Sequence, residues 1–421
     1  MPQRFACFLV PLLLLFTAVS ASAAALETEP PERVGMSSQR LERLSHELQE
    51  YVDDDRLAGA VVLVMRRGKV VYHEAFGERD AETNAQMQRD TIFRIASQTK
   101  AIVSTAVMML QEEGELLISD PVGKYLPEFL ETTVAVAREE GGYDVVAAER
   151  PVTIRDLLTH TSGFGYGYGI AGDQWLEAGI QGWYFADRDE PIADTVARMA
   201  KLPAEAQPGE DWVYGYNTDI LGALVERVSG QPLATFLSER ILKPLGMSDT
   251  HFYLPPAKRD RLAVVYASTP EGIDRAPEQG ANGQGAYVDG PRRSFSGGAG
   301  LLATATDYAR FLQMLLNGGE LDGQRILGRK SVELMTVDHL GNVEFAEGEG
   351  FGLGFSVVEE LGGRGKPGSV GEYGWGGAYH SQYWVDPAEQ LVVVYMTQLI
   401  PAGDLDDASK VRALVYQAIV D

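Results

Sequence analysis

The stretch FRIASQTK at residues 93–100, which runs on into AIVSTAVMML, decides the fold of this chain. Residues 96–110 are almost uniformly apolar or small, which predicts a helix that is buried on most of its sides. Ser97 and Lys100 stand at its start, three residues apart, so their side chains share one face. A serine at a helix start also lies in the positive field of the helix dipole. Both effects favour the alkoxide of Ser97.

The Ser97 and Lys100 pair has a chemical and a structural interpretation. A lysine desolvated by an apolar helix has a lowered pKa and can accept the serine proton, which makes Ser97 a nucleophile. In the structural alternative, Ser97 caps the helix and the Lys100 side chain extends to water. An S-x-x-K match of this kind arises readily by chance, so the tetrapeptide alone does not decide between the two.

A family resemblance rests on segments that follow one another in that family's order: 93–100, LLTHTSG at 157–163, PG at 208–209 with Trp212 and Tyr214, and LKPLGM at 242–247. They resemble the serine β-lactamase-related superfamily, which includes class C β-lactamases, D-alanyl-D-alanine carboxypeptidases and family VIII carboxylesterases. The resemblance covers residues 32–397 and is far more specific than S-x-x-K alone. It implies an α/β sandwich with a helical subdomain, in which Ser97 is the nucleophile and Lys100 its proton partner.

The family's second motif, Tyr-x-Asn, falls at Tyr214, but here Asn217 comes one place late. Tyr216 is therefore a competing tyrosine. The spacing from Tyr214 to the Leu-Gly pair at 221–222 resembles the esterase pattern Y-S-x-x-T-D-x-L-G, which favours Tyr214. A tyrosine between Lys100 and the substrate can act as a general base. For both tyrosines the structural alternative is a buried ring with a hydrogen-bonded hydroxyl.

The family's third motif, Lys-Thr-Gly on a strand at the sheet edge, is replaced by Trp375, Gly376 and Gly377, the form that family VIII esterases carry. In the lactamases and carboxypeptidases that lysine helps to hold the substrate carboxylate, and an indole cannot make this charge-assisted contact. We therefore expect a small ester or amide substrate, preferably a neutral ester. The backbone N–H groups of Ala378 and Ser97 are expected to form the oxyanion hole. The two glycines leave room for a substrate along the strand.

Strand patterns occur at both ends of the chain, at 60–65, 70–76, 355–358, 381–385 and 391–396. Helical patterns with turn residues between them dominate 116–290. The fold class expected is α/β, a β-lactamase-like antiparallel sheet flanked by helices. The sheet part of this single catalytic domain comprises 26–115 and 291–421, and 116–290 forms a mainly helical inserted subdomain. We expect the active site in the seam between the two parts. Aromatic residues at 164–185 are interpreted as core, with an acyl pocket as the alternative.

The first 25 residues have the pattern of a secretory signal peptide, with Arg4, an apolar run over 5–19 and small residues at 21–25. The apolar run is shorter than the ~20 residues that a spanning helix needs, so cleavage rather than anchoring is expected. The sequence thus predicts a periplasmic or secreted enzyme with no integral membrane segment after cleavage. Because Cys7 lies in this signal, the mature chain has no cysteine nucleophile and no disulfide.

The net charge of −24 argues against nucleic acid and anionic membrane surfaces as partners. The six histidines show no metal-ligand spacing such as H-E-x-x-H, so neither a metal nor a cofactor is expected. His160 and His380 would suit a Ser-His-Asp triad, but a G-x-S-x-G elbow is missing from the sequence. The resemblance implies a structural turn at His160, while His380 either lines the pocket or lies on the surface.

Two rivals to a carboxylesterase remain open at this point. One keeps the mechanism and changes the substrate to a β-lactam or a D-amino-acid peptide. The other is a non-catalytic ligand-binding or cell-wall-sensing domain that retains the fold.

Overall fold

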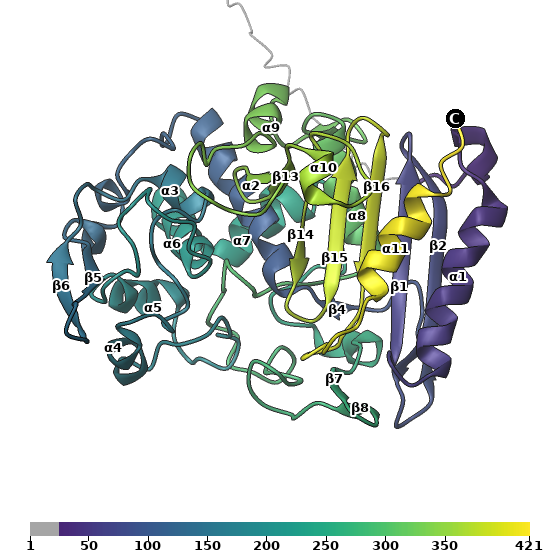
Figure 1. Ribbon diagram of the computed structural model, residues 1–421, viewed down its shortest axis with the longest axis horizontal. Helices are drawn as coiled ribbons and strands as arrows, with labels where there is room; N and C mark the ends of the chain where they lie inside the picture. Colours follow the sequence, from purple (N-terminus) through teal and green to yellow (C-terminus); the bar gives the residue numbers. More distant parts are fainter. Residues whose placement is uncertain (1–24) are drawn as a thin grey trace, which may run out of the picture.

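The computed structural model describes residues 25–421, and its centre is one antiparallel sheet in the order β12-β13-β14-β15-β16-β1-β2-β3 (Figure 1). The strands of this sheet are β1 Gly59–Arg66, β2 Lys69–Asp80, β3 Ala85–Gln86, β12 Glu349–Phe351, β13 Ser356–Val358, β14 Tyr373–Gly377, β15 Ser381–Asp386 and β16 Leu391–Met396. β1 pairs with β16, so the N-terminal hairpin and the C-terminal strands meet in the middle of the sheet. The expected α/β fold with a central antiparallel sheet is confirmed.

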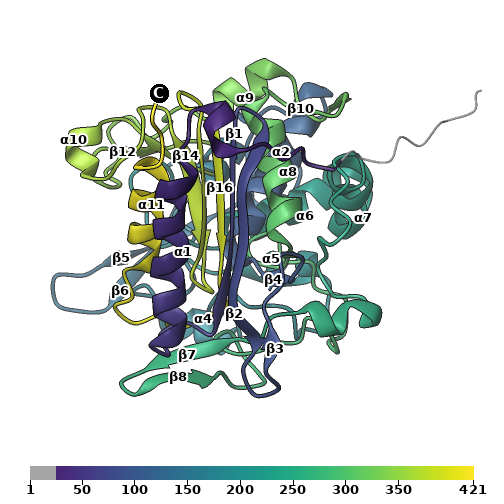
Figure 2. The same cartoon turned by 90° about the vertical axis from the view of Figure 1, so that its right-hand side faces the viewer.

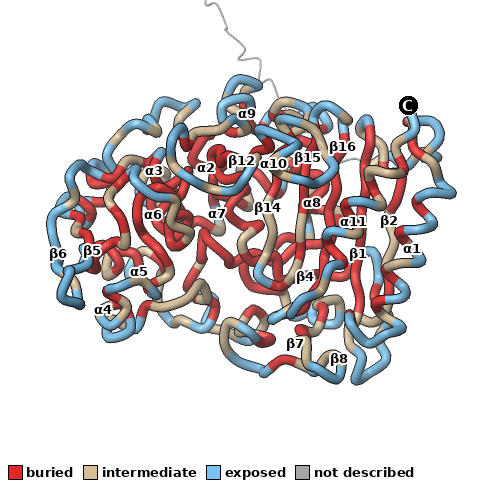
Figure 3. The backbone as a smooth tube through the Cα atoms, viewed as in Figure 1, coloured by how far each residue is buried: buried red, intermediate tan, exposed pale blue. Residues whose placement is uncertain are grey.

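Helices cover both faces of the sheet, and Figure 2 shows α1 and α11 on one side and α2 and α8 on the other. The helices are α1 Ser38–Asp53, α2 Thr99–Glu112, α3 Ile154–Leu158, α4 Gly172–Glu177, α5 Ile192–Met199, α6 Asn217–Ser229, α7 Leu233–Leu237, α8 Ala305–Leu316, α9 Arg329–Met335, α10 Leu361–Arg364 and α11 Asp407–Tyr416. Side chains alternate along β1: Val62 and Val64 pack in the cluster with α1 and α11, while Val61 and Leu63 pack with α2 and α8. Both faces are therefore buried (Figure 3).

The helix at the centre of the molecule starts later than the sequence predicts. Residues Ala96–Gln98 form a 3₁₀ turn, and α2 begins at Thr99. The reason is the backbone of Ala96, whose φ of +40° lies outside the helical region. Every residue of α2 from Thr99 to Leu110 is buried, as the apolar pattern predicts. Ser97 therefore stands on a tight turn below α2 rather than on the helix itself.

The chain between α2 and α8 carries α3 to α7. This chain and the segments that flank α2 and α8 also contain short strands that are not among those predicted from the sequence. They are β4 Phe93–Arg94 paired with β9 Leu302–Ala303, β5 Thr133–Ala137 with β6 Tyr143–Ala147, β7 Tyr266–Thr269 with β8 Gly272–Arg275, and β10 Glu320–Leu321 with β11 Gln324–Arg325. β4 and β9 bring the chain just before Ser97 against the chain just before α8. The boundaries 26–115, 116–290 and 291–421 stay a prediction.

Residues 1–24 of the signal peptide predicted at 1–25 lie outside the described residues. Among residues 25–421, no helix combines the length and the hydropathy needed to cross a membrane.

Candidate active site

Ser97 lies where the end of β14 meets the start of α2. Gly377, the last residue of β14, comes so close to the backbone there that an added Cβ would lie 2.6 Å from the carbonyl oxygen of Ile95. Only a glycine permits this approach, because real Cβ atoms do not come so close to an oxygen. Ala378 follows directly as the first residue of a turn and is exposed, whereas Tyr379 beside it is buried. The sheet thus brings Ala378 beside the turn that carries Ser97.

Lys100 is 2% exposed, and its Nζ makes three hydrogen bonds inside the protein. It donates to Ser97 Oγ at 3.3 Å, to the Tyr166 hydroxyl at 3.1 Å and to the carbonyl oxygen of Gly298 at 2.9 Å. An ammonium has three N–H donors, so these acceptors satisfy it without water. The structural alternative in which Lys100 extends to water is therefore wrong.

Asp219 holds the loop that supplies one of these acceptors. Its carboxylate is 1% exposed and accepts from Ser296 Oγ at 2.6 Å and from the Gly298 N–H at 3.1 Å. Burial raises the pKa of Asp219, while the Ser296 hydrogen bond and the charge of Lys100 lower it. A Cβ on Gly298 would lie 2.4 Å from Asp219 Oδ2, so this contact also depends on a glycine. Asp219 acts on Lys100 through the Gly298 carbonyl.

Tyr214 lies against both Lys100 and Trp375. Lys100 Nζ is 4.6 Å from the centroid of the Tyr214 ring, and the Trp375 indole N–H donates to the Tyr214 hydroxyl at 2.9 Å. Tyr216 is fully buried, and its hydroxyl donates to the carbonyls of Gly182 at 2.9 Å and Tyr166 at 3.2 Å. Burial raises the pKa of Tyr216. The structure thus brings Tyr214, and not the Tyr216 hydroxyl, next to the lysine.

Tyr166 is a site residue whose contact with Lys100 the sequence reasoning missed. Its hydroxyl accepts from Lys100, and its ring meets that of Tyr214 edge-on at 5.7 Å. Burial, followed by the nearby Tyr214, raises the pKa of Tyr166 well above its ordinary value. The only sequence signal was its place in the aromatic stretch 164–185, which was interpreted as core.

Trp375 belongs to a wall of aromatic rings beside Ser97 and Lys100. Trp212 stacks on Tyr214 with centroids 5.5 Å apart, and Phe345 lies 4.7 Å from Trp212. Phe351 meets Trp375 edge-on at 5.3 Å. Gly376, next along β14, is half-buried. A substrate that reaches Ser97 along this wall meets ring faces rather than a cation.

Similarity to known proteins identifies the family of this chain. A family model described as Beta-lactamase matches residues 44–417. The chain belongs to the beta-lactamase family. Esterase EstB of Burkholderia gladioli is 35% identical over 383 residues, which are 86% of this chain and 91% of that protein. Protein Rv1367c of Mycobacterium tuberculosis is 36% identical over 381 residues, with the same two coverages.

Solved structures agree with this assignment. EstCE1, described as a hydrolase with promiscuous acyltransferase activity, superposes with a TM-score of 0.75 at 28% identity, over 90% of this chain and 98% of that one. The resemblance to the β-lactamase-related superfamily is thereby confirmed. This member of the beta-lactamase family is an enzyme of the serine hydrolase superfamily. The individual roles of Ser97, Lys100, Tyr214, Trp375 and Ala378 stay predictions.

His160 has a structural position in this beta-lactamase-family site. Its side chain is 1% exposed, and its Nδ1 lies 2.9 Å from the Asn217 amide nitrogen. Burial first, and the charge of Lys100 second, lower the pKa of His160 well below its ordinary value. The ring is therefore neutral and its Nδ1 accepts the amide hydrogen. Its contacts include the Tyr214 ring at 4.8 Å.

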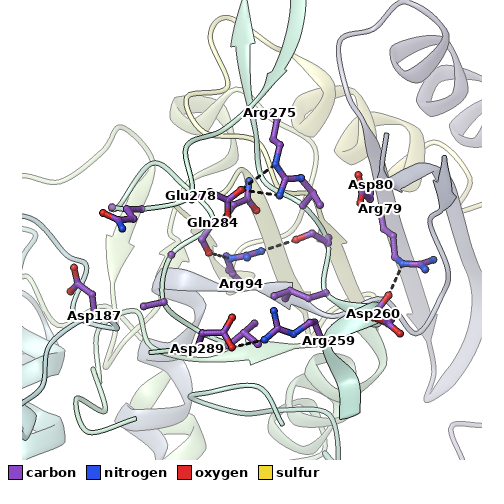
Figure 4. Close-up of a pocket in the computed structure, with 18 of the residues that line it drawn as sticks. Arg79, Asp80, Arg94, Asp187, Arg259, Asp260, Arg275, Glu278, Gln284 and Asp289 are labelled. Atoms are coloured by element: carbon purple, nitrogen blue, oxygen red, sulfur yellow. Dashed lines mark hydrogen bonds and ion pairs between the residues drawn. The ribbon is translucent and has the colours of Figure 1, made fainter. Parts of the chain in front are cut away.

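A separate pocket of about 850 Å³ has a lining that does not include Ser97 (Figure 4). Arg94 lies at its centre, 3% exposed, and donates to the carbonyl oxygens of Gln284 and Ala263 at 2.7 Å each. Arg275 and Glu278 form an ion pair on its wall. Arg94 thus ties two loops to β4, three residues before Ser97. Among residues 25–421 no cluster of histidine and carboxylate side chains suits a metal ion.

Proposed function

We propose that this chain is a carboxylesterase that forms an acyl-enzyme on Ser97. The proposal depends on one observation above all, the indole of Trp375. Its N–H is already bonded to the Tyr214 hydroxyl, and its ring meets those of Trp212 and Phe351 edge-on. This wall suits the uncharged acyl or alcohol part of an ester and offers a substrate carboxylate no charge-assisted contact. The esterase relative EstB supports the same class of substrate.

The acylation step uses groups that already touch one another. Acylation starts from the state in which the pair Lys100 and Tyr214 carries one proton fewer than an ammonium and a phenol together. Ser97 Oγ bonds to the ester carbonyl carbon, and its proton passes to this pair. The backbone N–H groups of Ser97 and Ala378 take up the negative charge on the carbonyl oxygen, a contribution of about 3 kcal/mol per donor. The tetrahedral intermediate collapses, the carbon–oxygen bond to the alcohol breaks, and the alcohol leaves with the proton.

Deacylation repeats these steps with water as the nucleophile. Water attacks the acyl carbon and gives its proton to the same group, the bond to Ser97 Oγ breaks, and the serine regains a proton as the acid is released. We further propose that the enzyme acts after export, in the periplasm or outside the cell, because residues 1–25 have the pattern of a signal peptide.

The test offers purified enzyme a short-chain nitrophenyl ester and, in parallel, a chromogenic cephalosporin. We expect ester turnover that Ser97→Ala abolishes, and negligible cephalosporin turnover. Fast lactam hydrolysis with little esterase activity would overturn the substrate class in favour of a lactamase or peptidase. A fluorophosphonate should label the native enzyme and spare Ser97→Ala. Equal labelling of the two, or none, would mean a binding domain that retains the fold.

A further inference from the structure

The His380 side chain, in the turn that carries Ala378, makes a hydrogen bond to Asp407 at the start of α11. We propose that this pair is a clamp that holds the turn 378–380 so that the Ala378 N–H points at the substrate carbonyl oxygen. The inference deepens the proposed function, because it rests on Ala378 as an oxyanion donor. His380 is then a positioning residue, which acts through the backbone and does not touch the reacting atoms.

The turn 378–380 joins β14 to β15 and leaves its third residue in an unfavourable conformation. Gly377 faces Ser381 as the last pair of the hairpin, and the His380 N–H donates to the Gly377 carbonyl at 3.0 Å. His380 has a φ of +67°, in the left-handed region that residues with a Cβ avoid. A glycine is the usual residue at this place in a three-residue hairpin loop. A histidine there needs a contact that offsets the strain.

The contact that His380 makes is a part-buried hydrogen bond to a buried carboxylate. Its Nε2 lies 2.6 Å from Asp407 Oδ1, and Asp407 is 0% exposed. The other oxygen of this carboxylate accepts from the Tyr395 hydroxyl of β16. Asp407 is also the first residue of α11, where the helix dipole stabilises a negative charge. A buried carboxylate needs such partners, so His380 is fixed at a defined place against α11.

The rest of the turn is fastened from the end of β16. Thr397 Oγ1 donates to the carbonyls of Tyr379 and His380 at 3.0 Å each, and the Leu399 N–H donates to Tyr379 at 3.2 Å. With Gly377 packed on Ile95, the residues on both sides of Ala378 are held. Ala378 itself is exposed. The clamp therefore acts on the one residue of the turn whose N–H faces the substrate.

A role for His380 as the general base does not fit these contacts. Among the described residues no hydrogen bond joins His380 to Ser97: the His380 side chain bonds to Asp407, and the Ser97 hydroxyl accepts from Lys100. The other ionisable groups near the pair are Tyr395 of β16 and, on α11, Asp406, which bonds Tyr51 of α1 and pairs with Lys410. These groups belong to the packing of α11 on the sheet and not to the site of Ser97.

The test compares His380→Ala, His380→Gly and Asp407→Asn, with Asp406→Asn as the matched control one residue away. We expect kcat for a nitrophenyl ester to fall at least ~10-fold in His380→Ala and Asp407→Asn with KM nearly unchanged, because an oxyanion donor acts on charge that exists only in the transition state. His380→Gly should regain a large part of that loss, since glycine adopts a φ of +67° without a clamp. Asp406→Asn should keep the native kcat.

A purely structural role predicts a different pattern, in which His380→Ala lowers the melting temperature while kcat per folded molecule stays within about twofold of native. That result would overturn the inference, as would a kcat in His380→Gly as low as in His380→Ala. The rate of fluorophosphonate labelling at Ser97 separates this failure from failure of the proposed function. Native enzyme that labels fast while His380→Ala labels equally fast refutes only the clamp, whereas native enzyme that does not label refutes the proposed function and the clamp together.

Discussion

Tyr214 and Tyr216 provide a matched pair of substitutions, because each loses only a hydroxyl as phenylalanine. In Tyr214→Phe the hydroxyl that accepts from Trp375 disappears, while the ring that lies against Lys100 remains. If Tyr214 moves the proton of Ser97, kcat/KM should fall by about 10²–10⁴. That factor corresponds to roughly 3–5 kcal/mol of transition-state stabilisation. The fold should be little affected, because the ring keeps its stacking on Trp212.

The opposite pattern is expected for Tyr216→Phe. Its hydroxyl is bonded to the carbonyls of Gly182 and Tyr166, and its loss leaves the Gly182 carbonyl without this donor, whereas the Tyr166 carbonyl still accepts from the Gly182 N–H at 3.0 Å. We expect a cost of about 1–3 kcal/mol in the free energy of unfolding. Activity per folded molecule should stay within about threefold of native, since the hydroxyl does not reach Lys100.

Both variants are compared by steady-state kinetics on one nitrophenyl ester and by urea unfolding followed by circular dichroism. The reasoning is refuted if Tyr216→Phe loses as much kcat/KM as Tyr214→Phe while remaining folded. If Tyr214→Phe keeps a near-native kcat/KM, the proton of Ser97 instead passes through Tyr166, whose hydroxyl is bonded to Lys100.

Two further predictions concern residues that pack around the site, and a third concerns the stability of the fold. Gly377→Ala puts a Cβ on the carbonyl of Ile95, so we expect the turn to shift and kcat/KM to fall by about 10² or more, measured on the same ester; an unchanged rate would contradict the close approach. Asp219→Asn removes a carboxylate that holds the Gly298 loop, and we expect slower fluorophosphonate labelling at Ser97, with Ser296→Ala giving a smaller loss. Burial lowers the pKa of His251 to about 4. Between pH 6.5 and 4 the unfolded chain therefore binds a proton that the folded protein does not bind, so the free energy of unfolding decreases as the pH is lowered. In His251→Gln the melting temperature should depend less on pH over that window, and an identical slope would count against a neutral, buried ring.

The sequence predicts the parts of the site that lie close together along the chain. Ser97 and Lys100 meet because a spacing of three residues places side chains on one face of a helical turn. The buried lysine follows from the apolar run 101–110 around it. The 3₁₀ turn was not predictable, because it depends on the positive φ of Ala96, and a pattern of apolar residues carries no information on one backbone angle.

The contacts that join distant segments were largely beyond the sequence. The acceptors of Lys100 include a backbone carbonyl, that of Gly298, which no side-chain pattern marks. Tyr166 was interpreted as a core residue because a tyrosine ring can be buried while its hydroxyl still makes a hydrogen bond. The sequence did mark Asp219, by its place in the pattern Y-S-x-x-T-D, but that pattern alone assigns it no role. The hairpin of β5 and β6 was also marked in the sequence, by valine-rich runs on both sides of Gly141 and Gly142.

Trp375 links the choice of substrate to the proton chemistry of the site. An indole N–H donates a hydrogen bond and carries no charge, whereas a lysine at the family's third motif donates and is cationic. The bond from Trp375 uses one lone pair of the Tyr214 hydroxyl and leaves its hydrogen free to point elsewhere. The exchange of lysine for tryptophan therefore keeps a donor that orients Tyr214 and removes the charge that would hold a substrate carboxylate. A single substitution at this strand can thus preserve attack by Ser97 while it shifts the preferred substrate from an anion to a neutral ester.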